Sequence, residues 1–70
     1  MSQYDVLAVN LSTKVVRILA KRKTKLNAEH IADFAVMRRG VETEFYPIVE
    51  ADSYNEGDWY QGDPPEQSHA

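Results

Sequence analysis

The chain has 70 residues, of which 43% are hydrophobic and 27% are charged, with no cysteine and a formal net charge of −3. This length suits one small domain and excludes a two-domain enzyme. Without cysteine there is neither a disulfide nor a thiolate metal site, so the fold depends on packing alone. The first residues contain no basic segment followed by a long apolar run, which predicts a cytoplasmic protein without membrane contact.

Two short apolar segments predict a β-hairpin. Tyr4–Val9 and Val15–Ala20 are rich in β-forming residues, and a polar five-residue segment between them supplies turn residues. Strict alternation in the second strand places Val16, Ile18 and Ala20 on one apolar face. We therefore expect one face of the sheet to pack against a helix.

A helix is predicted over Ala28–Arg39. Asn27 is suited to the N-cap, and Leu26 with Ile31 is suited to a hydrophobic staple around the first turn. Gly40 can take the positive φ that ends a helix. The expected buried stripe consists of Ala28, Ile31, Ala32, Phe34 and Ala35.

A third strand is predicted over Thr43–Val49, where Pro47 removes a backbone donor and so favours an edge or bulged strand. The resulting fold class is α+β with the order β-β-α-β. We expect a three-stranded, mainly antiparallel sheet with the first strand central and the helix on one face. The compact domain is predicted over residues 1–51, with a short extra strand at 57–61 and a disordered acidic tail over 62–70.

Charge is distributed unevenly along the chain. Residues 14–39 contain all eight basic residues and two acidic ones, whereas residues 40–70 contain eight acidic residues and no Lys or Arg. One interpretation is that the two halves interleave in space as solvated faces. The other is a bipolar surface that steers a partner.

The segment after the third predicted strand, residues 50–63, mixes aromatic and acidic residues. Large aromatics in a polar segment are typical anchors of protein interfaces. The alternative is that Tyr54, Trp59 or Tyr60 folds back to cover the sheet. The predicted protein-contact residues are Tyr46, Glu50, Asp52, Tyr54, Glu56, Asp58, Trp59 and Tyr60.

Nucleic-acid binding is the alternative suggested by the basic residues. A basic run precedes the predicted helix N-terminus, where phosphate could meet both side-chain charge and free backbone N–H groups. The low pI of about 5.2 and the lack of interleaved aromatics count against it. The residues concerned are Lys21, Arg22, Lys23, Lys25, Arg38 and Arg39.

No enzymatic motif is present in the sequence. There is no Gly-rich phosphate loop, no nucleophile with a paired base and no metal-ligand pattern. His30 falls in the first turn of the predicted helix, where a lone histidine is usually a surface or capping residue. We therefore expect neither catalysis nor a cofactor or metal.

Three blocks, Leu26–Ile31, Ala35–Val41 and Glu44–Tyr46, resemble a stretch found in small bacteriophage accessory proteins, and the resemblance covers residues 14–50. It implies no catalytic residue. It implies a protein that binds a host protein in the host cytoplasm and blocks or redirects it. The sequence thus predicts a small non-enzymatic protein-binding module, with nucleic-acid binding and self-association, such as a homodimer, as alternatives.

Overall fold

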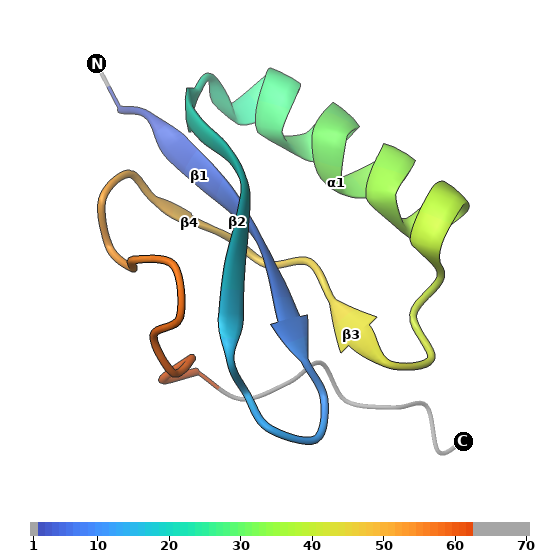
Figure 1. Ribbon diagram of the computed structural model, residues 1–70. Coiled ribbons are helices and arrows are strands. Elements are labelled where there is room, and N and C mark those ends of the chain that lie inside the picture. The colour runs from blue at the N-terminus through green and yellow to red at the C-terminus, as the bar shows by residue number, and fades with distance from the viewer. Residues whose placement is uncertain (1, 63–70) are drawn as a thin grey trace.

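The computed structural model describes residues 2–62 and contains one antiparallel sheet with a helix on one face (Figure 1). The elements are β1 (Tyr4–Asn10), β2 (Val16–Lys23), α1 (Lys25–Arg39), β3 (Glu44–Phe45) and β4 (Ile48–Glu50). Strand β1 is central, with β2 on one side and both β3 and β4 on the other. The predicted α+β class, element order and central first strand are confirmed. The predicted tail lies, from residue 63 onward, outside the described residues.

Strand β1 is buried on both of its faces. Val6 and Ala8 belong to the core beneath α1, whereas Leu7 and Val9 belong to a second core on the opposite face of the sheet. A strand covered on both faces needs a continuous apolar run rather than alternation, and this is what the sequence between residues 6 and 9 provides. The sheet is therefore the middle layer of the fold.

Strand β2 contains a bulge, which makes the predicted face assignment wrong. Leu7 is opposite Ile18 but Val6 is opposite Ala20, so Leu19 is an extra residue in the pairing. An extra residue reverses the side-chain alternation beyond it. Consequently Ile18 packs on the face away from α1, whereas Leu19 and Ala20 pack beneath the helix.

Helix α1 begins three residues earlier than predicted. The N-cap is Thr24, whose Oγ1 accepts a hydrogen bond from the Asn27 backbone N–H at 3.2 Å. Asn27 is therefore inside the helix, and the predicted cap and staple are wrong: Leu26 lies in the first turn with its side chain 62% exposed. Thr24 directly follows β2, and its hydroxyl accepts the first-turn hydrogen bond that the prediction assigned to Asn27.

Replacing Thr24 by Ala is expected to lower the free energy of unfolding by about 1 kcal/mol, because the helix loses its capping oxygen. Asn27→Ala is the matched control. It replaces an exposed helical residue by a better helix former, so stability should stay the same or rise by up to about 0.7 kcal/mol. Urea denaturation of the two variants measures the difference. If Asn27→Ala lowers the free energy of unfolding more than Thr24→Ala does, Asn27 is the N-cap.

The predicted helix end and strand interruption are both present. Gly40 follows the helix with φ of 78°, and its N–H donates to the Val36 carbonyl oxygen at 2.9 Å. Pro47 separates β3 from β4, while its carbonyl oxygen still accepts a hydrogen bond from the Leu7 N–H at 3.1 Å. A proline lacks the donor but keeps the acceptor, so the chain stays beside β1 across the interruption.

The C-terminal segment, residues 52–62, covers the sheet face opposite α1 (Figure 1). Tyr54 and Tyr60 pack on the second core, and the Phe45 and Tyr60 ring centroids are 5.4 Å apart in an edge-on arrangement. The extra strand predicted at 57–61 is reduced to an isolated bridge between Val15 and Trp59. The described fold thus has three layers and extends beyond the predicted limit at residue 51.

Candidate functional site

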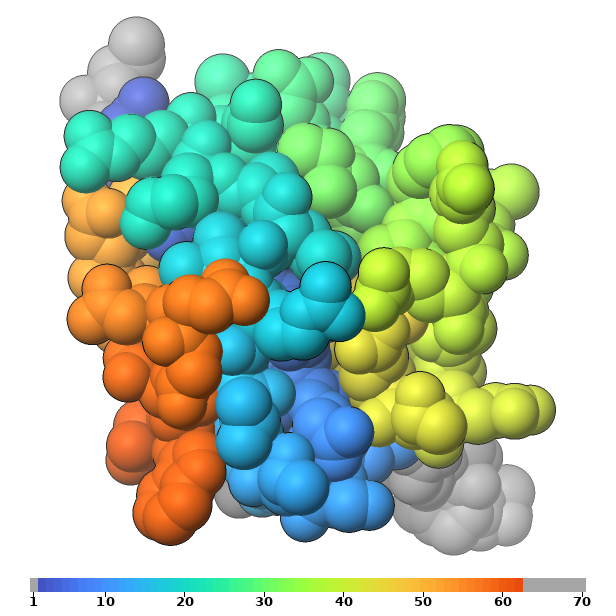
Figure 2. Space-filling view, in the orientation of Figure 1, coloured from blue at the N-terminus to red at the C-terminus, as the bar shows by residue number. Residues whose placement is uncertain are grey.

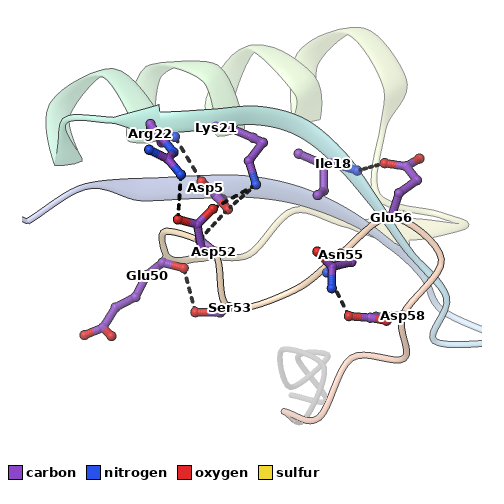
Figure 3. A network of polar contacts seen from close by, with 10 residues as sticks. All are labelled: Asp5, Ile18, Lys21, Arg22, Glu50, Asp52, Ser53, Asn55, Glu56 and Asp58. Carbon is purple, nitrogen blue, oxygen red and sulfur yellow. Dashed lines mark hydrogen bonds and ion pairs between the residues drawn. The ribbon is translucent and has the colours of Figure 1, made fainter.

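A buried carboxylate joins the C-terminal segment to the sheet (Figure 3). Asp5 is 0% exposed, and its two oxygens accept hydrogen bonds from the backbone N–H groups of Arg22 at 2.9 Å and Asp52 at 3.0 Å. Both donors have positive φ, 58° and 64°, which costs energy in a residue with a side chain. Asp5 therefore stabilises two unfavourable backbone conformations at once.

Charged side chains complete this network at the surface. Lys21 Nζ lies 3.6 Å from Asp5 Oδ2 and 3.2 Å from Asp52 Oδ1, and Arg22 Nη2 lies 2.9 Å from Asp52 Oδ2. Burial raises the pKa of the Asp5 carboxyl, but the two backbone hydrogen bonds and the charge of Lys21 lower it more. The net result is a pKa below the ordinary value, so Asp5 is ionised at neutral pH.

The predicted acidic contact residues of the C-terminal segment are used within the fold. Glu56 Oε1 accepts a hydrogen bond from the Ile18 backbone N–H at 2.9 Å, and Asp58 Oδ2 accepts one from the Asn55 N–H at 2.7 Å. The backbone carbonyl of Asp58 accepts from the Val16 N–H at 2.8 Å. The segment thereby pairs with the start of the free edge of β2, a position that would otherwise present unpaired donors.

The predicted aromatic contact residues are divided between the two cores and the surface. Tyr46 is buried beneath α1, where its hydroxyl lies 2.7 Å from the Gly40 carbonyl oxygen and 3.0 Å from Glu44 Oε2. Burial and the Glu44 carboxylate both raise the pKa of Tyr46 above its usual value. Tyr54 and Tyr60 lie on the opposite face of the sheet. Trp59 differs from these three because its side chain is 69% exposed.

The six predicted nucleic-acid-binding residues do not form one patch. Lys21 and Arg22 pair with Asp52, and Arg39 Nε pairs with Glu44 Oε2 at 2.7 Å. Lys23 ends β2 and Lys25 begins α1, whereas Arg38 and Arg39 lie at the end of this helix of 15 residues, which is roughly 22 Å long. The structure thus places these residues in two separated clusters, each partly paired with acidic side chains.

The orientation of α1 is a feature that the sequence analysis missed. The helix buries its small residues, Ala28, Ala32 and Ala35, against the sheet, and exposes large apolar ones. Leu26 and Met37 are eleven residues apart, three turns of helix, so they lie along one line on the outside. Phe34, which was predicted to be buried, is 56% exposed beside this line.

We call Leu26, Phe34 and Met37 the outer helix surface. Met37 is 81% exposed, the largest value among the exposed large hydrophobic residues. Single exposed apolar residues are normal, but three large ones on one 15-residue helix make this surface a candidate interaction site, although exposed His30 and Asp33 lie between Leu26 and Met37. The sequence signal was the spacing of the three alanines, which defines a narrow buried stripe that excludes every large side chain of the helix except the half-buried Ile31.

Comparison of the chain with protein-family models, with curated proteins and with solved structures finds no match. Within residues 2–62, no helix is long and apolar enough to cross a membrane. The geometry described above is therefore the basis for proposing a function.

Proposed function

We propose that this chain is a small non-enzymatic protein-binding module whose partner contacts the outer helix surface. The observation that carries the proposal is that α1 buries three alanines and leaves the large apolar side chains of Leu26 and Met37 in water. Transferring these two side chains into an interface removes apolar area from water, the main favourable contribution to protein association. Methionine also adapts to partners of different shape.

The resemblance of residues 14–50 to small bacteriophage accessory proteins favours a bacterial host protein as the partner. A chain acting in this way blocks or redirects that protein by occupying its surface. It needs no catalytic group, which agrees with the absence of an enzymatic motif from the sequence.

The proposal predicts that the double substitution Leu26→Gln and Met37→Gln abolishes partner binding without unfolding the chain. Both side chains are exposed, so the free energy of unfolding should change by less than about 1 kcal/mol. The measurement is retention of a bacterial protein by the immobilised wild-type chain and by the variants, from lysate with and without nuclease treatment, with thermal melts to verify folding.

Trp59→Gln is the matched control, because it replaces another exposed apolar side chain in a different layer of the fold. Retention that survives Trp59→Gln and is lost in the double variant supports the outer helix surface. Retention that is lost only with Trp59→Gln moves the site to the C-terminal segment. Material that disappears entirely with nuclease, or no specific retention by the wild-type chain, contradicts a protein partner.

A further inference from the structure

A groove separates β2 from the C-terminal half of α1, and Figure 2 shows it between the cyan strand and the green-to-yellow end of the helix. It measures about 410 Å³, within the size range of ligand-binding clefts. We call it the β2–α1 groove; it is lined by Leu19, Ile31, Phe34, Ala35, Arg38 and Arg39.

The groove combines an apolar floor with a positive rim. Leu19 and Ile31 are half-buried, and the Arg38 guanidinium lies 5.3 Å from the centroid of the Phe34 ring. Arg39 is held at the end of the groove by its ion pair with Glu44. Arg38 is therefore the rim charge available to a ligand, because no ion pair engages it within the described chain. Such a site fits an aromatic side chain next to a carboxylate.

The same chain carries a matching element on the other side of the sheet. Trp59 is 69% exposed, and it follows the exposed residue Asp58, whose Oδ2 accepts a hydrogen bond from the Asn55 N–H. The C-terminal segment is fixed to β2 by backbone hydrogen bonds, including Val16 N–H to the Asp58 carbonyl oxygen at 2.8 Å, and to the preceding turn by Tyr60 N–H to the Lys14 carbonyl oxygen at 2.9 Å. Because α1 and this segment cover opposite faces of the sheet (Figure 1), Trp59 is not among the residues that line the groove of its own chain.

We propose that the β2–α1 groove of one copy receives Trp59 of a second copy. The indole packs on Leu19 and Phe34, and the carboxylate of Asp58 approaches Arg38. The groove lies against α1 and Trp59 belongs to the segment on the opposite face of the sheet, so the contact is head-to-tail and each copy can engage two neighbours. The groove shares Phe34 with the outer helix surface, but Leu26 and Met37, on which the proposed function is tested, take no part in this contact.

Sedimentation velocity from about 10 µM to about 1 mM tests the proposal, the range in which a contact much smaller than a standard interface becomes populated. The wild-type mass should rise above the 8.0 kDa of the monomer as concentration increases, and should fall when salt is added. Trp59→Gln removes the inserted side chain, and Arg38→Glu reverses the rim charge. Both residues are exposed, and each variant should be folded and remain a monomer.

Mixing the two variants gives the decisive result. The Trp59→Gln chain keeps an intact groove and the Arg38→Glu chain keeps Trp59, so the mixture should form a 1:1 dimer that does not grow. The Leu26→Gln, Met37→Gln chain should associate like the wild type, which separates this proposal from the protein-binding function.

Three results would overturn it. The first is a wild-type chain that stays monomeric at the highest concentration. The second is association that either single variant leaves unchanged, which would place the contact elsewhere. The third is a mixture of the variants that remains monomeric, which would mean a symmetric interface. If the wild-type chain stays monomeric but binds a different protein through Arg38, the self-association proposal is wrong and the groove binds that other partner.

Discussion

Asp5→Asn is expected to lower the free energy of unfolding at pH 7 by about 2–4 kcal/mol. The buried carboxylate accepts hydrogen bonds from the backbone N–H groups of Arg22 and Asp52, one on each oxygen. An amide of the same shape has one oxygen, so its NH₂ group would face one of these donors. The chain would then bury an unsatisfied N–H, release a residue of positive φ and lose the charge that attracts Lys21. Urea denaturation at pH 7 measures the loss.

The same substitution should change the pH dependence of stability. Because the pKa of Asp5 is lower in the fold than its ordinary value of 3.8, its contribution is complete above that value. The contribution is lost as the pH falls through the lower pKa of the folded state. The difference in stability between the wild type and Asp5→Asn should therefore shrink as the pH is lowered from about 5 to about 2.

Asp52→Asn is the control for Asp5→Asn, because it makes the same chemical change in the same network at an exposed position. Its ion pairs with Lys21 and Arg22 are at the surface, so the expected loss is below about 1 kcal/mol. Equal losses for the two variants would show that Asp5 is no more important than a surface carboxylate.

Local patterns predicted those parts of the fold that depend on local interactions. The apolar run of β1, the end of α1 at Gly40 and the interruption at Pro47 each follow from a few adjacent residues. The helix start was misplaced because two capping residues, Thr24 and Asn27, compete within one turn. The hydroxyl of Thr24 makes the capping hydrogen bond in the structure.

Features that depend on contacts between distant residues were not predicted. Asp5 accepts hydrogen bonds from Arg22, 17 residues away in the sequence, and from Asp52, 47 residues away. The bulge at Leu19 comes before Arg22 in β2, so it also affects which residue of this strand is opposite Asp5. The sequence feature that pointed to this network was Asp5 itself, a charged residue at the start of an apolar strand. A charge buried at such a position needs hydrogen-bonding or charged partners. Which partners it would have depended on the path of the C-terminal segment.

The charge distribution is partly explained by pairing between the two halves of the chain. Lys21 and Arg22 from the basic half meet Asp52 from the acidic half, and Arg39 meets Glu44. For these residues, the contacts agree with the interpretation that the basic and acidic halves of the chain interleave in space. Arg38 is outside these pairs, which is why the positive rim of the β2–α1 groove was not visible from a count along the sequence.

Tyr60→Ala is expected to lower the free energy of unfolding by about 2–3 kcal/mol, whereas Trp59→Ala should change it by less than about 1 kcal/mol. Tyr60 packs edge-on against Phe45 and lies 5.4 Å from Tyr54, centroid to centroid, in the core on the face opposite α1. Its removal leaves a cavity over Phe45, whereas the Trp59 side chain already lies mostly in water. Urea denaturation of the two variants under the same conditions provides the comparison.

Adjacent aromatic residues of one segment thus have separate roles. If the two substitutions cost the same, the C-terminal segment would not be packed as a third layer, and the edge of β2 that Glu56 and Asp58 now pair would be open. With the expected difference, Tyr60 belongs to the core that makes the fold stable. Trp59 is then free to act between molecules, because changing it does not unfold the chain that presents it.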